Sequence, residues 1–120
     1  MDTGCGLQAI ASRMSGLLKA LEIINALRVI HPEMPMQMAS VFIVIAMQPG
    51  IYQRDLPEII GISQSSVSRN VTALTKMTRH GTQGLGLVVR RHDPEDGRGY
   101  ELYLSKAGRL LEERLVALSR

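Results

Sequence analysis

The segment from Gly61 to Leu74 constrains the fold more than any other part of the chain, because its apolar and polar side chains separate at helical spacing. Ser63 stands where a helix should begin, since its hydroxyl can accept a hydrogen bond from an amide that the first turn leaves unpaired. Val67, Val71 and Leu74 recur at positions i, i+4 and i+7, which predicts one apolar stripe turned inward. The opposite side is expected to carry Ser65, Ser68, Arg69, Thr72 and Lys76.

This outer side is polar and basic, and it contains no carboxylate. A helix of this kind can lie in the major groove of DNA, where small hydroxyls allow close approach and Arg69 can bond to guanine or phosphate. An ordinary amphipathic surface helix would show the same pattern. The segment taken alone leaves both interpretations open.

The distribution of charge favours the DNA interpretation. No acidic residue occurs between Glu58 and Asp93, whereas five basic residues fall inside that gap: Arg69, Lys76, Arg79, Arg90 and Arg91. The net charge of the chain is +3, and residues 1–53 hold three basic and three acidic residues, so the surplus lies in the second half. A local excess of this kind is typical of a surface that binds phosphate.

The flanking segments predict a helix-turn-helix followed by a wing. Residues 53–61 read as a short helix that Gly61 ends, and a three-residue turn would join it to the next helix. Residues 87–91 and 100–104 read as two strands, because Tyr100, Leu102 and Leu104 alternate with more polar residues. The turn-rich segment 93–99 would connect them into a hairpin.

Residues 56–115 resemble the multiple-antibiotic-resistance regulator (MarR) family of winged-helix transcription factors. Three segments carry the resemblance: residues 62–74, residues 89–99 and residues 104–115. The Asp-Pro-x-Asp-x-Arg wing followed by Leu-Ser-x-x-Gly is fairly specific, whereas many bacterial regulators share the helix-turn-helix. The resemblance implies a mainly α, dimeric winged helix-turn-helix with a small β-hairpin wing. It also implies a homodimeric repressor that binds a palindromic operator in double-stranded DNA.

Two groups of residues are predicted to contact DNA. The group on the recognition helix is Gln64, Ser65, Ser66, Ser68, Arg69, Thr72 and Lys76, and the group on the wing is Arg90, Arg91, Asp96 and Arg98. Arg98 would project from the tip of the hairpin between two glycines and enter the minor groove. By resemblance, Asp96 would brace Arg98 or a neighbouring arginine. The alternative is a solvated, charged hairpin.

The chain is expected to form one domain over residues 1–120, with residues 7–30 as an N-terminal core and dimerisation helix and residues 105–120 as a C-terminal helix. Residues 1–6 are expected to be a tail. Apolar residues at heptad-like spacing predict a dimer contact, completed by the C-terminal helix: Leu7, Ile10, Met14, Leu17, Leu21, Ile24, Leu115 and Leu118. The alternative is that all of these side chains belong to one core.

Four features between and around these segments carry further expectations. Pro32 and Pro35 should separate the first helix from residues 36–47, a β-branched run that suits a buried helix better than a strand. Residues 51–52 are expected to add a short strand to the wing sheet. Pro57 is expected in the first turn of a helix that starts after Asp55 or Leu56.

Residues 75–85 exceed the family pattern by about eight residues, and their glycines indicate a loop. One more helical turn through Met77 and Thr78 is also expected before the loop, which would place Lys76, Arg79 and His80 beside the DNA-reading face. The loop either adds a contact to the DNA backbone or is a mobile excursion.

The sequence indicates no enzyme, metal site or cofactor. No Gly-x-Ser-x-Gly motif occurs, and the three histidines lack ligand spacing. One cysteine, Cys5, cannot form an internal disulfide, and no nearby basic residue favours its thiolate. Without a signal peptide or membrane span, the protein is expected in the cytoplasm. A small-molecule effector stays open. The rival functions are a protein-interaction module and a non-specific architectural or replication accessory protein.

Overall fold

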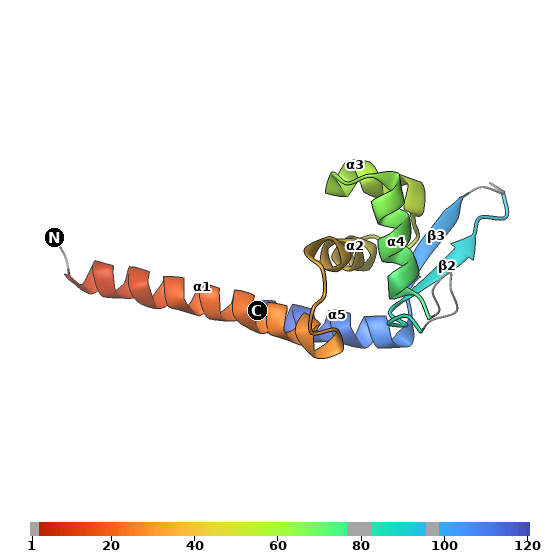
Figure 1. The fold of residues 1–120 in the computed structure, drawn as a ribbon. Coiled ribbons are helices and arrows are strands. Elements are labelled where there is room, and N and C mark those ends of the chain that lie inside the picture. The colour runs from red at the N-terminus through yellow and green to blue at the C-terminus, as the bar shows by residue number, and fades with distance from the viewer. Residues whose placement is uncertain (1–2, 77–82, 96–98) are drawn as a thin grey trace.

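The computed structural model describes residues 3–76, 83–95 and 99–120, with backbone alone for residues 3–5. The elements follow the order α1 (Thr3–Ile30), α2 (Met36–Met47), β1 (Ile51–Tyr52), the 3-10 helix η1 (Gln53–Asp55), α3 (Leu56–Ile60), α4 (Gln64–Leu74), β2 (Val88–His92), β3 (Tyr100–Leu104) and α5 (Lys106–Ser119) (Figure 1). This is the predicted mainly α winged helix-turn-helix with a small wing.

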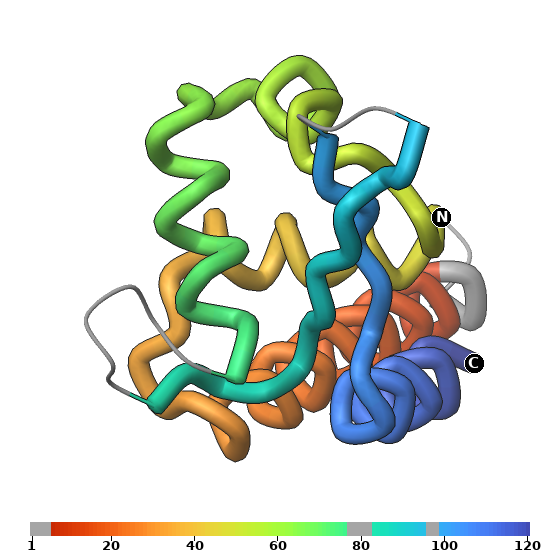
Figure 2. Tube along the Cα trace, turned by 90° about the vertical axis from the view of Figure 1, so that its right-hand side faces the viewer, coloured from red at the N-terminus to blue at the C-terminus, as the bar shows by residue number. Residues whose placement is uncertain are grey.

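The chain is elongated because α1 extends far beyond the body that the other elements form (Figure 1). Its principal extents are 63 × 26 × 23 Å. The C-terminal part of α1 runs alongside α5 at the base of the body, as Figures 1 and 2 both show. The N-terminal part of α1 projects away from this base.

The core lies where α2 and α4 pack together beside the wing sheet. Phe42 and Ile45 of α2, Leu74 of α4 and Leu102 of β3 are completely buried. Full burial of an apolar side chain of this size contributes about 1.5–3 kcal/mol relative to its exposure. The prediction that residues 36–47 form a helix is therefore confirmed, although the helix is buried on one side only and Met36 and Met47 at its ends are exposed.

The turn between α3 and α4 follows its predicted chemistry. Gly61 ends α3 with a φ of 82°, a left-handed conformation that glycine adopts without steric cost. The Ser63 hydroxyl accepts a hydrogen bond from the Ser66 amide at 3.1 Å and so caps α4. Pro57 lies in the first turn of α3, as expected, where its missing amide hydrogen costs little.

The wing is a three-stranded antiparallel sheet in the order β1-β3-β2. β1 pairs Ile51 with Leu102, which confirms the predicted short strand. β2 pairs Val88 with Leu104 and His92 with Tyr100. Alternate residues of β2 therefore face the body and the solvent.

Two expected boundaries are wrong. α1 begins at Thr3 and not after Gly6, because the segment holds no proline and its glycines weaken the helix without ending it. α4 ends at Leu74, so Lys76 lies beyond the recognition helix and the expected extra turn does not start. The returning segment takes the last carbonyls of α4, since Leu85 N donates to Ala73 O and Leu87 N to Leu74 O. Met77 and Thr78 lie outside the described residues.

Gly108 permits the close approach of α5 to the segment before β2. A Cβ atom there would lie 2.1 Å from the Leu87 carbonyl oxygen, whereas one at Gly16, on exposed α1, would meet nothing within 4 Å. We expect Gly108→Ala to lower the free energy of unfolding by about 1–3 kcal/mol through overpacking. Gly16→Ala, the matched control, should raise it by about 0.5–1 kcal/mol. Urea denaturation tests both, and equal stabilities of the two variants would contradict this packing.

Candidate nucleic-acid interface

The two faces of α4 differ in burial as the sequence predicts. The side chains of Val67, Val71 and Leu74 are at most 1% exposed. On the other side Ser65 and Arg69 are exposed, and three further residues are partly or fully accessible: Gln64, Ser68 and Thr72. Because the apolar stripe is held in the core, the hydroxyls and the guanidinium point away from it.

A hydroxyl cluster orders the N-terminal turns of α4. The Ser63 and Ser66 hydroxyls lie 3.0 Å apart, and Arg69 Nη2 donates to Ser66 Oγ at 3.2 Å. The Ser66 hydroxyl is thus engaged within the helix, although the sequence predicted it as a DNA contact. This arrangement holds the Arg69 cation on the outer face of α4.

Arg90 faces inward and connects the wing to α4. Its Nη2 atom donates to Thr72 Oγ1 at 2.5 Å, and its guanidinium carbon lies 5.5 Å from the centre of the Tyr100 ring. Burial lowers the pKa of the Arg90 guanidinium. Its Nε atom is buried and has no hydrogen-bond partner among the described residues.

Arg91 lies on the opposite face of the sheet. Its guanidinium carbon is 5.3 Å from the centre of the Tyr103 ring. The Tyr103 hydroxyl donates to Glu101 Oε2 at 2.7 Å, and this hydrogen bond raises the pKa of Tyr103. The two adjacent arginines therefore do not form one surface.

The base of the wing depends on Asp93, which the sequence did not identify as a site residue. Its carboxylate accepts a hydrogen bond from the Tyr52 hydroxyl, which raises the pKa of Tyr52 to about 12. Asp93 Oδ1 accepts from the Glu95 amide at 2.9 Å, and the Asp93 amide donates to Gly99 O. The Asp-Pro pair is a turn signal that could have indicated this role.

The outer part of the predicted wing site lies outside the described residues. This applies to Asp96 and Arg98, whose roles stay predictions. It applies equally to Arg79 and His80 of the loop after α4. Lys76 is described and exposed, two residues beyond the end of α4.

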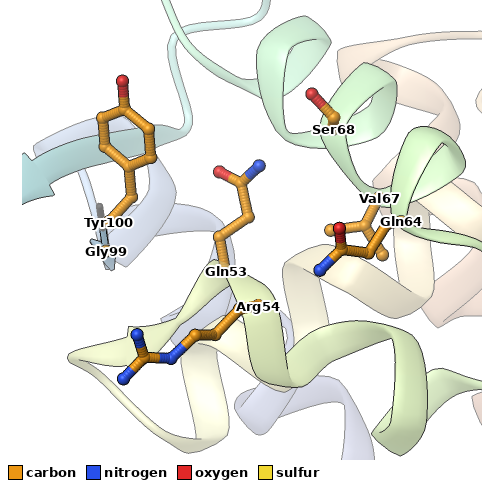
Figure 3. A pocket seen from close by; sticks show the side chains of 7 residues that line it. All are labelled: Gln53, Arg54, Gln64, Val67, Ser68, Gly99 and Tyr100. Carbon is orange, nitrogen blue, oxygen red and sulfur yellow. The ribbon is translucent and has the colours of Figure 1, made fainter.

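A hollow of about 270 Å³ lies between α4, η1 and the base of β3 (Figure 3). Its lining residues come from these three elements and include no carboxylate: Gln53, Arg54, Gln64, Val67, Ser68, Gly99 and Tyr100. The sequence prediction missed Gln53, Arg54 and Tyr100 because no helical periodicity connects them to α4. Arg54 stacks over the Tyr52 ring at 4.6 Å from its centre.

The apolar residues predicted for dimerisation are exposed along α1. Each of them is at least 41% exposed: Leu7, Ile10, Met14, Leu17, Leu21 and Ile24. Leu115 and Leu118 of α5 are half-buried, and each lines a groove that α1 also borders. The Leu115 groove continues onto exposed Met47 of α2.

The described part of the chain shows no group of three His, Cys, Asp or Glu residues that could hold a metal ion. Within the same ranges, none of the helices combines the length and the apolar character that crossing a lipid bilayer requires.

No protein-family profile and no curated protein matches the sequence. The fold and the exposed face of α4 define a winged helix-turn-helix protein. Solved structures of transcriptional regulators, several of them MarR proteins, share this fold. The fold of this chain is therefore MarR-like. Tm0710 from Thermotoga maritima is 20% identical with a TM-score of 0.69, and the match covers 95% of this chain and 72% of that chain.

Two further structures show the same likeness. The multiple antibiotic-resistance repressor from Listeria monocytogenes is 28% identical with a TM-score of 0.56, and the match covers 98% of this chain and 68% of that chain. The PcaV transcriptional regulator from Streptomyces coelicolor is 24% identical with a TM-score of 0.59, at 98% and 74% coverage. The three structures are thus described as transcriptional regulators or as a repressor.

The contact between Arg90 and Thr72 should stabilise the fold. Thr72→Val keeps the β-branched shape but removes the acceptor, which leaves a second donor of the half-buried guanidinium unpaired. We expect the free energy of unfolding to fall by about 1–3 kcal/mol, as for other hydrogen bonds to charged groups. Thr72→Ser, the control, keeps the hydroxyl and should stay closer to the wild type. Chemical denaturation measures both variants. A smaller loss of stability in Thr72→Val than in Thr72→Ser would contradict the contact.

Proposed function

We propose that this protein is a sequence-specific regulator of transcription that binds double-stranded DNA as a homodimer, most simply as a repressor on a palindromic operator. The observation that best supports this proposal is the orientation of α4. Its valine side is locked in the core, while an acid-free side with Ser65 and Arg69 is exposed next to a wing. The MarR-like fold of known regulators supports the same function.

The proposed complex places α4 in the major groove. Ser65 and Arg69, two exposed polar side chains of its outer face, would approach base edges, where arginine can form two hydrogen bonds to guanine. The wing would lie over the adjacent minor groove. In a two-fold dimer, the two copies of α4 would enter successive major grooves about 10 bp apart.

The proposed dimer would bury the apolar side chains that α1 exposes. An apolar row of this length on a projecting helix is rarely left in contact with water. A second copy could bury it by laying its own α1 along the grooves between α1, α2 and α5 that Leu115 and Leu118 line. The contact would be the same patch on both subunits, as a two-fold dimer requires.

Arg69→Ala tests the DNA-reading role. Selection from random duplexes should give a palindromic consensus for the wild type. We expect Arg69→Ala to weaken binding to that consensus by about 1–3 kcal/mol and to relax preference at one base position per half-site. Arg109→Ala, which removes an exposed charge from α5, should bind as the wild type does.

Three other results would contradict the proposed function or favour a different one. Equal binding by Arg69→Ala would show that α4 is placed wrongly. Binding without sequence preference would favour an architectural or accessory protein, since phosphate contacts alone carry no sequence information. A wild type that selects no duplex would favour a protein-interaction module whose basic face docks on an acidic partner.

Leu17→Glu tests the dimer. Leu17 lies on the apolar row at 59% exposure, and a carboxylate there would be desolvated in the proposed interface. We expect the wild type to sediment as a dimer and Leu17→Glu as a monomer with unchanged helix content. Ser12→Glu adds the same charge on the opposite side of α1 and should stay dimeric. A monomeric wild type, or equal dimerisation of both variants, would contradict the interface.

A further inference from the structure

The hollow between α4 and the wing has the chemistry of an anion site. Its seven lining residues contribute amide, hydroxyl and guanidinium groups but no carboxylate. Figure 3 shows the Gln53 amide standing between Tyr100 on one side and Gln64 and Ser68 on the other. Two elements, η1 and α4, thus bring amide and hydroxyl groups to one small space, while the Arg54 guanidinium extends away from Gln64 and Ser68 (Figure 3).

One lining atom lacks the partner that its burial calls for. Gln53 Oε1 is buried and has no hydrogen-bond partner among the described residues. A buried acceptor in this condition costs about 1–3 kcal/mol, and unpaired groups of this kind are uncommon in folded proteins. This oxygen is closed to solvent, so the amide nitrogen is the polar atom of Gln53 that a molecule in the hollow could contact.

The position of the hollow indicates what enters it. In the proposed complex, α4 occupies the major groove and the wing lies over the neighbouring minor groove. A sugar-phosphate strand separates the two grooves of a duplex, so this strand must pass between α4 and the wing. The hollow lies there, with Gln64 and Ser68 on its α4 side and Gly99 and Tyr100 on its wing side.

We propose, resting on the proposed function, that the hollow binds one phosphodiester group of each half-site. Gln64 and Ser68 would donate hydrogen bonds to its oxygens, and Arg54 would add positive charge at the rim. Gln53 would donate through its amide nitrogen. Gln64 and Ser68 would then fix the register of the protein on the duplex and not read bases.

Two substitutions at Gln53 test this site on the full-length protein and the duplex selected by the wild type. Gln53→Met removes the buried acceptor and the donors at similar size. We expect it to bind that duplex about 5- to 30-fold more weakly, while its unfolding midpoint stays equal or rises because an unpaired group is gone. Gln37→Met, at an exposed position of α2, should change neither property.

Gln53→Glu identifies the phosphate. Each phosphate of the duplex is replaced singly by an uncharged methylphosphonate, and binding is measured for each duplex. With the wild type, one position per half-site, between the grooves, should weaken binding. With Gln53→Glu, the same replacement should improve binding, because it removes the repulsion between a carboxylate and a phosphate. Gln53→Met should be less sensitive than the wild type at that position, since Gln64, Ser68 and Arg54 would still face the phosphate, and unchanged at the others.

The possible failures are distinct. If the wild type binds no selected duplex, the proposed function and the phosphate site fall together. If the wild type binds and every methylphosphonate has the same effect on Gln53→Met and Gln53→Glu as on the wild type, the phosphate site alone falls. Weaker binding by Gln53→Met together with lower stability would make Gln53 a structural residue, which also overturns the proposal.

Discussion

The burial of one side of α4 determines how this protein can present itself to a partner. Val67, Val71 and Leu74 are inaccessible, and they fix the rotation of the helix about its own axis. A rotation that exposed Arg69 less would have to bring valine into water at a cost of about 1.5–3 kcal/mol for each side chain. The orientation of the polar face is therefore a consequence of the core. No contact with a partner is needed to fix the orientation of this face.

Leu87 joins α4, the helix proposed to face DNA, to α5, a helix of the proposed dimer contact. Its amide donates to Leu74 O at the end of α4, and its carbonyl accepts from the Ser105 amide at the start of α5. Gly108 also lies close to this carbonyl, since a Cβ atom there would be 2.1 Å from the Leu87 oxygen. One residue thus contacts both α4 and α5 through its backbone.

Local signals made most of the fold predictable. As helix caps, Gly61, Ser63 and Ser105 bond to backbone groups within four residues, so the sequence contains these capping interactions. The site was less predictable because its contacts are distant in sequence: Arg90 bonds to a residue 18 positions away and Tyr52 to one 41 positions away. Strand alternation separates Arg90 from Arg91, but only the fold determines which of them faces α4.

This separation changes the meaning of the charge excess between residues 59 and 92. Arg90 is half-buried and holds the wing against Thr72, and Arg91 stacks on the outer face of the sheet. Of the described basic residues in this stretch, Arg69 and Lys76 are the ones that face away from the body near α4. In the proposed complex, neutral donors would therefore supply part of the contacts between the described residues and a phosphate strand. A hollow lined by amides and hydroxyls is the feature that such a division of roles requires.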